Sequence, residues 1–406
     1  MVCSLSLAKK LSYWHGRYMP HIKVSPFDTR MLDGDMVRWR AMVSDGDNEL
    51  VGVEYEGEPF LLEVRKQVDH YLIKPEKSTR PLDVNKIKKT LKALIESAGL
   101  DLLHENISLS PSKPPLASKY SKSIADFEDV DFGDTKIAIE VGFGSGRHLL
   151  YQALSNPDIL HIGIEIHTPS AQQVLKQIEL QQIDNIWVVN YDARLLLEML
   201  PSNAASMIYV HFPVPWDKKP HRRVISHEFV AESLRVLDAG GALELRTDSN
   251  LYYNYALEVF GAPSSSHFEV RKNNEALIRS KYEDRWLRQE KDIYTLTLYC
   301  DTHSHELEND YDFSFDGDAV DVDVLLNLPR QPIVQDSMFV HFERRYRMID
   351  GSGVLIKCAF GSFDRPEHRF IIRRDGDIYY YPHLPVRSKT NYLAHQTIRG
   401  YVLCQM

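Results

Sequence analysis

Hydrophobic and polar positions alternate with two different periods in the middle of the chain, between about residues 125 and 300. Apolar runs of strand length are separated by segments of helical period such as PSAQQVLKQIELQQ and SHEFVAESLRVL. The apolar runs are KIAIEVG, LHIGIEI, NIWVVN, SMIYVHF and GALELRT. Buried strands that alternate with helices are typical of a parallel sheet. The pattern therefore predicts an α/β fold with a doubly wound sheet, whose ligands bind at the carboxyl ends of the strands.

The region before this sheet predicts a small α+β fold. ELVGVEYEGEPFLLEVRKQ indicates two strands joined by a turn, and DVNKIKKTLKALIESAG indicates an amphipathic helix. Asp83 is the expected N-cap of that helix, and Gly99 is its expected end. The helix face predicted to be apolar comprises Val84, Ile87, Leu91, Leu94 and Ala98.

The region after the sheet predicts an antiparallel β meander. FVHFERRYRM, GVLIKCAFGSF and HRFIIRRDGDIYYYP are strand-like and are separated by turns. Arginines and aromatic residues interleave in this region: Arg344, Arg345, Arg347, Arg369, Arg373 and Arg374 with Phe342, Tyr346, Phe370, Tyr379 and Tyr380. The mixture suits RNA contact and base stacking, but it is equally typical of a half-buried sheet with one charged face.

Two polar segments mark the expected domain boundaries. Residues 108–123 are rich in Pro, Ser and Lys, and residues 301–323 contain nine carboxylates and no Lys or Arg. Self-repulsion favours an exposed linker in the acidic segment, which lacks the ordered ligand positions of a calcium loop. The expected organisation is an N-terminal α+β extension (1–122), the doubly wound domain (123–300), an acidic linker (301–323) and a β-rich C-terminal domain (324–406).

Composition narrows the class of protein without identifying it. The 406 residues are 43% hydrophobic and 26% charged, as in an ordinary globular protein. A net charge of −9 argues against indiscriminate coating of nucleic acid but permits a local basic patch. The four cysteines lie far apart, so neither a disulfide framework nor a metal site is predicted. No apolar run has the length of a signal peptide core or a membrane span, so a cytoplasmic protein is expected. Oligomeric state cannot be inferred from these features.

The loop after the first strand of the sheet indicates a nucleotide-like cofactor. In EVGFGSGR, Gly142, Gly144 and Gly146 follow a buried strand and open a helix, but Arg147 occupies the third glycine of a dinucleotide fingerprint. Glu140, on the strand just before the glycines, would repel a pyrophosphate and attract a cationic group. S-adenosylmethionine carries a cationic amino-acid group and no phosphate, so it is the predicted cofactor.

Two more acids follow the next two strands. Glu165 in GIEIH is placed to accept hydrogen bonds from ribose hydroxyls. Asp192 in VVNYDA is placed to accept a hydrogen bond from the adenine amino group. The alternative is that each acid merely caps the following helix. Three acids at the ends of three consecutive strands, with the glycine loop among them, favour the cofactor interpretation.

The stretch HFPVPWDKKPHRRV, residues 211–224, sets a rigid Pro-Val-Pro corner before a cluster of positive charge. An isolated basic run is usually a solvated loop. At the end of the fourth strand of this sheet, the same charges are placed to contact RNA phosphates. The residues expected to do so are Lys218, Lys219, His221, Arg222 and Arg223.

These motifs, together with LRTDSNLY and SKYEDRW, resemble the bacterial tRNA (guanine-N7)-methyltransferases, which have the Rossmann-like class I methyltransferase fold. The resemblance covers roughly residues 135–300 and leaves both flanks unexplained. It implies methyl transfer from S-adenosylmethionine to N7 of a guanosine in the tRNA variable loop. It also implies the binding residues: Glu140, Gly142, Gly144, Glu165 and Asp192 for the cofactor, and Lys218, Asp248, Ser280 and Glu283 for the guanosine.

The chain departs from the family pattern at the Pro-Val-Pro corner. Val214 replaces an aspartate that relatives typically carry there, so no catalytic residue is assigned, and Ser280 replaces a threonine. Two alternatives follow: a tRNA-binding protein with impaired catalysis, or a methyltransferase for another substrate. Both keep the fold and the cofactor pocket.

Overall fold

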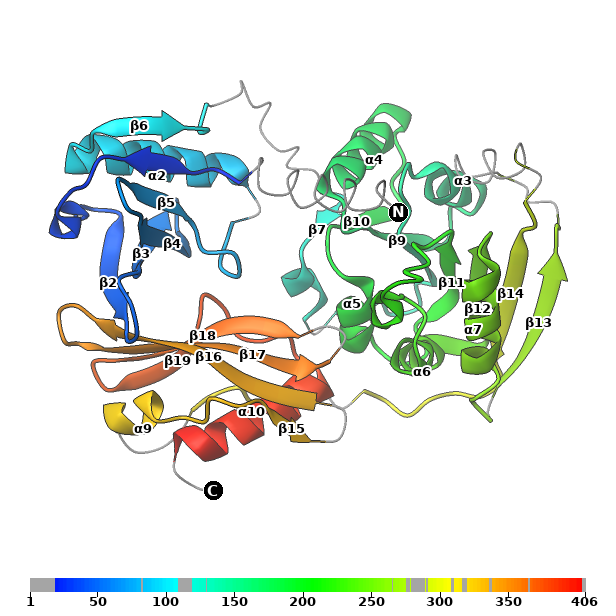
Figure 1. Cartoon of the computed structure of the whole chain (residues 1–406). Helices are drawn as coiled ribbons and strands as arrows, with labels where there is room; N and C mark the ends of the chain where they lie inside the picture. The colour runs from blue at the N-terminus through cyan, green and yellow to red at the C-terminus, as the bar shows by residue number, and fades with distance from the viewer. Residues whose placement is uncertain are drawn as a thin grey trace, which may run out of the picture. The chain divides into compact units, whose positions relative to one another are not determined.

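The computed structural model describes most of the chain, in two compact units (Figure 1). Unit 1 comprises residues 1–113 and 312–406, and unit 2 comprises residues 114–311. The described residues are 19–81, 83–108, 119–128, 130–264, 266–274, 278, 289, 291–307, 310–315, 320–335, 338–363 and 366–403.

Unit 2 contains the predicted doubly wound sheet. Its eight strands among the described residues run in the order β13-β14-β12-β11-β8-β9-β10-β7. The strands are β7 (Ser121–Lys122), β8 (Ile137–Val141), β9 (Leu160–Ile164), β10 (Ile186–Val189), β11 (Ala205–His211), β12 (Leu237–Thr247), β13 (Ser266–Lys272) and β14 (Tyr294–Cys300). All neighbours from β7 to β12 pair in parallel, and β14 and β13 add an antiparallel edge. The predicted α/β class and all five predicted strands are confirmed.

Helices cover both faces of this sheet, with α3 and α4 on one side and α5 and α6 on the other (Figure 1). The helical segments of unit 2 are η2 (Ile124–Phe127), α3 (Arg147–Ser155), α4 (Thr168–Gln181), α5 (Ala193–Met199), η3 (Pro220–Arg222), α6 (His227–Val236) and α7 (Asn250–Phe260). Val174 and Ile178 of α4 are buried with Leu149 of α3 against Ile186 and Val188 of the sheet. Burial of these aliphatic side chains stabilises the strand ends that carry the candidate site.

Unit 1 is built around an eleven-stranded antiparallel sheet among the described residues. Its strands are β1 (Ile22–Val24), β2 (Val37–Val43), β3 (Glu49–Tyr55), β4 (Glu58–Lys66), β5 (Tyr71–Pro75), β6 (Leu102–Glu105), β15 (Ile333–Gln335), β16 (Met338–Met348), β17 (Gly353–Ser362), β18 (Glu367–Arg374) and β19 (Asp377–Tyr381). Its helical segments are η1 (Thr29–Met31), α2 (Val84–Ala98), α9 (Val322–Leu326) and α10 (Lys389–Val402).

Helix α2 has the predicted ends. The Asp83 side chain accepts a hydrogen bond from the Asn85 N–H, and Gly99 ends the helix in the left-handed conformation with φ of 56°. The predicted face is buried at Ile87, Leu91, Leu94 and Ala98, whereas Val84 remains 38% exposed.

The two flanks, which the sequence analysis treats as separate regions, combine in unit 1. Strand β16 pairs with β2 through Tyr346 and Val43, and β17 and β18 continue the sheet. A shared core lies between the two halves of the sheet and includes Trp39, Leu61, Tyr346, Phe370 and Tyr381. Linker composition identifies breaks along the chain, but it does not predict which strands pair across them.

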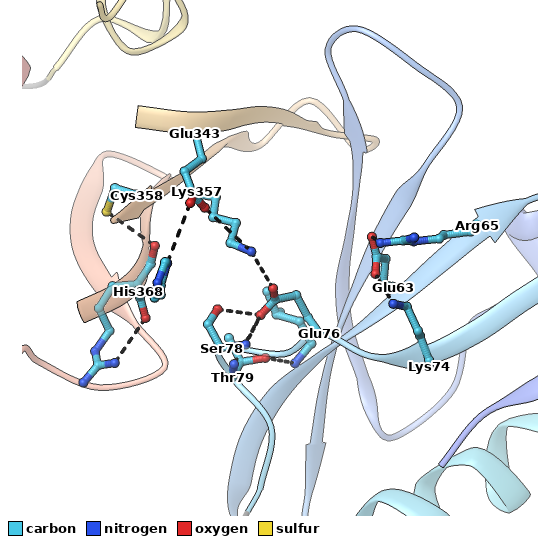
Figure 2. A network of polar contacts seen from close by, with 12 residues as sticks. Glu63, Arg65, Lys74, Glu76, Ser78, Thr79, Glu343, Lys357, Cys358 and His368 are labelled. Atoms are coloured by element: carbon cyan, nitrogen blue, oxygen red, sulfur yellow. Dashed lines mark hydrogen bonds and ion pairs between the residues drawn. The ribbon is translucent and has the colours of Figure 1, made fainter. Parts of the chain in front are cut away.

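A network of polar contacts also links the flanks within unit 1 (Figure 2). The Lys357 ammonium on β17 lies 2.8 Å from a Glu76 oxygen just after β5 and 3.8 Å from Glu343 on β16. The other Glu76 oxygen accepts from the Ser78 amide, 2.7 Å away. These contacts satisfy a carboxylate that would be costly to bury alone.

The acidic segment 301–323 is packed in part, rather than exposed throughout. Phe313 and Phe315 are 3% and 7% exposed and contact the His395 ring on α10. Asp321 caps α9 by accepting from the Asp323 N–H. Two aromatic residues among the acids thus anchor a segment whose composition favours a linker.

Candidate active site

The glycine loop leaves β8 through three left-handed residues. Gly142, Gly144 and Gly146 have φ of 73°, 53° and 72°, a region that glycine adopts without a steric penalty. A Cβ atom placed on Gly142 would meet no atom within 4 Å, whereas one on Gly146 would lie 2.3 Å from Val174 Cγ2. The first glycine therefore leaves space for a ligand, and the third allows α3 and α4 to pack closely.

Glu165 holds the glycine loop at the end of β9. One carboxylate oxygen accepts from the Gly144 N–H at 3.0 Å, and the other accepts from the His167 N–H at 2.9 Å. The residue is 9% exposed. Because β8, β9 and β10 are adjacent and parallel, Glu140, Glu165 and Asp192 lie at or near one edge of the sheet, as the sequence predicts.

Asp192 performs the capping role that the sequence analysis kept as an alternative. Its Oδ1 accepts from the Arg194 N–H at 3.0 Å at the start of α5, and Oδ2 pairs with the Arg194 guanidinium at 2.8 Å. A third of the side chain is exposed, so adenine can still approach it. Asp192 is thus a cap in this structure, and its contact with adenine stays a prediction.

Glu140 is buried, with 5% of its surface exposed. Its Oε2 lies 2.8 Å from Nδ1 of His148, the second residue of α3. Sequence reasoning did not find His148, because a polar residue near a helix start is usually solvated.

The sequence analysis also did not identify Ile166 as a candidate site residue. It follows Glu165 directly and is 75% exposed, although isoleucine is usually buried. An exposed apolar side chain beside a carboxylate suits a ligand with an apolar ring next to a diol. Its position immediately after the strand-end acid was the available signal.

These residues fit S-adenosylmethionine better than a dinucleotide. Glu140 and Glu165 present negative charge on either side of the glycine loop, where a pyrophosphate would be repelled. A cationic amino acid and a ribose diol are the complementary groups. Glu140, Glu165 and the open space at Gly142 therefore fit these two groups.

The loop after β11 adopts an unusual backbone. Phe212 and Trp216 have φ of 50° and 47°, which is rare for bulky side chains and typical of functional sites. Between them Val214 is 60% exposed. Trp216 is 37% exposed, and the Arg222 guanidinium lies 5.1 Å from its ring centroid. The Pro-Val-Pro corner thus presents two exposed apolar side chains beside a cation.

The basic residues of this loop have different environments. Lys218, Lys219 and Arg222 are exposed, as phosphate contacts require. Arg223 is only 7% exposed, so its expected role as a phosphate contact needs correction. Its Nε donates to the Pro215 carbonyl at 2.8 Å, and its guanidinium lies 4.7 Å from the Tyr255 ring centroid.

Arg223 instead stabilises the loop. Its guanidinium lies 5.1 Å from the Tyr252 ring centroid and 3.6 Å from an Asp217 carboxylate oxygen. Asp217, the acidic residue of this loop, is therefore engaged within it. The side chain of His221 lies outside the described residues.

The substrate-side residues are described only in part. Asp248 follows β12 and pairs with Lys291 at 2.8 Å, with 19% of its side chain exposed. Ser280 and Glu283 lie outside the described residues, so their placement beside Asp248 stays a prediction.

The aromatic side chains of the C-terminal meander are mostly core residues. Phe342, Tyr346, Phe370 and Tyr380 are at most 4% exposed, whereas Tyr379 is 39% exposed. Base stacking by the four buried rings is therefore excluded in this structure. The half-buried sheet is the interpretation that the packing supports.

Comparison with known proteins identifies the family. Residues 134–296 match a family model described as "Putative methyltransferase". The chain is 40% identical to the tRNA (guanine-N(7)-)-methyltransferase of Wolinella succinogenes over 358 residues, 87% of this chain and 91% of that protein. The chain belongs to this tRNA (guanine-N(7)-)-methyltransferase family. A protein of the same name from Helicobacter hepaticus is 37% identical over 359 residues, 86% of this chain and 89% of its own length.

The similarity to these family members extends into the flanks. An aligned length of 358 residues exceeds residues 123–300, so part of unit 1 must be included. The resemblance seen in the sequence motifs alone stopped at the doubly wound domain and was too short. Among the residues that the structure describes, no helix has both the length and the apolar composition that crossing a bilayer requires.

Proposed function

We propose that this chain transfers a methyl group from S-adenosylmethionine to N7 of a guanosine in the tRNA variable loop. The observation that carries the proposal is the placement of Glu140, Glu165 and Asp192 along one sheet edge beside the open glycine loop. Its relatives across most of the chain bear the name of this activity. The proposal agrees with the cytoplasmic location expected from the sequence.

The chemistry requires placement more than acid-base catalysis. Guanine N7 has an available lone pair at the major-groove edge, so no base is needed to create the nucleophile. When bound, S-adenosylmethionine supplies an activated methyl group whose sulfur leaves as a neutral thioether. The work of the protein is to align the two reactants, and well-oriented reactants gain several kcal/mol in this way.

The residues divide this work between the two sides of the site. Glu140 and Glu165 would hold the amino-acid and ribose ends of the cofactor, and Asp192 would accept a hydrogen bond from the adenine amino group. Lys218 and Asp248 orient the guanosine, together with Ser280 and Glu283. Lys219, His221 and Arg222 bind neighbouring phosphates, which position the RNA without reading its sequence.

The names of the relatives do not favour the alternative of a binding protein with impaired catalysis. Val214 removes a carboxylate that would orient guanine, but it leaves the nucleophile unchanged. We therefore expect the wild-type protein to be active.

The test is nucleoside mass analysis of unmodified tRNA after incubation with the full chain and S-adenosylmethionine. We expect 7-methylguanosine to form once per tRNA. The control is the same tRNA with 7-deazaguanosine at the target position, which lacks the accepting nitrogen and should remain unmodified. Methylation of that control, or methylation at a different base, would contradict the proposal.

A further inference from the structure

Polar side chains occupy one face of three adjacent strands beside the cofactor loop. The register aligns Tyr209 on β11 with Glu140 on β8 and with Glu244 on β12, and aligns His211 with Arg246. Because alternate residues of a strand face opposite sides, these five side chains share one face. The alternate positions are apolar and buried: Ile139, Ile208, Val210, Leu243 and Leu245. Such a polar face inside a folded unit is costly unless its groups pair with one another.

His148 reaches this face from α3 and contacts Glu140. Its Nδ1 lies 2.8 Å from Glu140 Oε2, and the amide nitrogen of Gln152 lies 3.1 Å from its Nε2. An amide nitrogen only donates, so Nε2 accepts and the ring proton resides on Nδ1. His148 therefore donates from Nδ1 to the Glu140 carboxylate.

A second histidine–carboxylate pair lies against the first. His211 Nε2 is 2.8 Å from Glu244 Oε1, and the rings of His148 and His211 are 4.6 Å apart between centroids. The side chains of His148 and His211 are 12% and 10% exposed. Two imidazolium ions this close and this buried would repel each other, so one proton strongly opposes a second.

Other titratable groups lie near the two histidines. Tyr209 lies 4.7 Å from the His148 ring, and burial raises its pKa to about 12. Burial lowers the pKa of His161 on β9 to about 4 and also lowers the pKa of His211. Arg246 pairs in register with His211 on the same face.

We propose that His148 is a positioning residue for Glu140, which it orients toward the ammonium group of bound S-adenosylmethionine. A carboxylate held by a fixed donor is aligned for its ligand before binding, and loss of the donor removes that alignment. Cofactor affinity should therefore depend on a hydrogen-bond donor at the position of His148 Nδ1. The inference rests on the proposed function for the identity of the cofactor.

The experiment is titration calorimetry of the full chain with S-adenosylmethionine at pH 7, where the α-amino group of the ligand is mostly an ammonium. His148→Asn places an amide nitrogen, which can also donate, near the position of Nδ1. We expect it to bind within about threefold of wild type. His148→Leu removes the donor and should weaken binding about 5- to 150-fold.

His227→Asn is the matched control, since His227 is an exposed histidine at the start of α6. It should retain wild-type affinity. Full affinity in a folded His148→Leu would overturn the inference, as would a loss of affinity in His148→Asn as large as that in His148→Leu. If His148→Leu fails to fold, His148→Ala takes its place, and full affinity in that variant overturns the inference.

S-adenosylhomocysteine separates the inference from the proposed function. It keeps the ammonium group but lacks the sulfonium, so it should show the same dependence on His148. Dependence for S-adenosylmethionine alone would overturn the assignment to the ammonium group. Absence of binding of either ligand to wild type would overturn the proposed cofactor and the inference together, whereas binding that is insensitive to His148 would overturn the inference only.

Discussion

Arg222 and Arg223 are adjacent in the chain but occupy opposite environments. Arg222 is exposed above Trp216, whereas Arg223 is buried against Tyr252 and Tyr255. The basic cluster is predictable from sequence, but which of its side chains are exposed and which are buried is not. A loop has no regular period from which the direction of each side chain could be inferred.

Single substitutions should separate the two roles. Arg222→Ala should weaken tRNA binding across sequences and lower the salt slope by about one unit, since one phosphate contact is lost. Arg223→Ala should instead destabilise the loop by roughly 1–3 kcal/mol, because the Pro215 carbonyl loses the hydrogen bond that the Arg223 guanidinium donates. Filter binding at several salt concentrations measures the first effect, and amide hydrogen exchange of peptides from residues 211–224 measures the second. An unchanged salt slope in Arg222→Ala would make this stretch an ordinary solvated loop.

Substitutions at Val214 and Asp248 test the residues expected to orient the guanosine. Restoring the family carboxylate with Val214→Asp adds at most one charge-assisted contact to guanine, worth about 1.5–3 kcal/mol. Single-turnover rates should therefore change by no more than about ten- to a hundredfold. Asp248→Ala should lower the rate and leave cofactor affinity unchanged. A wild-type rate in Asp248→Ala would show that the family role does not transfer to this residue.

At the scale of elements, the glycine loop connects β8 to α3 and packs against α4 through Gly146 and Val174. Sequence spacing predicted the loop and its strand, because three glycines after a buried run are a local signal. The close approach of α3 to α4 at Gly146 was not predictable, since it depends on Val174, which lies in a different helix.

Gly146→Ala should therefore lower the free energy of unfolding more than Gly142→Ala does. Both force alanine into the left-handed region, which costs about 1–2 kcal/mol. Gly146→Ala should cost roughly 1–3 kcal/mol more, because its Cβ overlaps Val174 Cγ2. Amide hydrogen exchange of α3 and α4 measures the difference. Val174→Ala should recover part of the excess in the double variant, and equal costs at the two glycines would contradict the packing argument.

At the scale of the whole chain, unit 1 depends on pairing between residues such as Val43 and Tyr346, which are far apart in the sequence. Strands β2 and β16 were each predictable from alternating hydrophobicity, but their partnership was not. Local pattern indicates that a strand forms, whereas partner choice depends on long-range packing. Lys357 and Glu76 illustrate this point, since neither residue is distinctive in its own segment.

The ion pair between Lys357 and Glu76 contributes to the acid stability of unit 1. Burial alone would raise the pKa of Glu76, but the Lys357 ammonium and the Ser78 hydroxyl and amide together lower it below its usual value. A carboxyl whose pKa is lower in the folded state contributes stability above its unfolded pKa, near 4.5. That contribution is lost as the pH falls through the lower, folded value.

Lys357→Met should leave the Glu76 carboxylate buried without its cation and destabilise unit 1 by about 3–5 kcal/mol at pH 7. The difference from wild type should shrink as the pH falls from 7 toward 3. Without a cation beside it, buried Glu76 of the folded variant takes up its proton at a higher pH than Glu76 of folded wild type. Since the chain has two compact units, one unfolding midpoint is not well defined, and hydrogen exchange of β5 and β17 peptides is the appropriate measurement. Lys77→Met, at an exposed neighbouring lysine, should change stability by less than about 0.5 kcal/mol. A difference between Lys357→Met and wild type that stays constant from pH 7 to pH 3 would show that lost packing of the lysine stem, rather than the charge of Glu76, causes the effect.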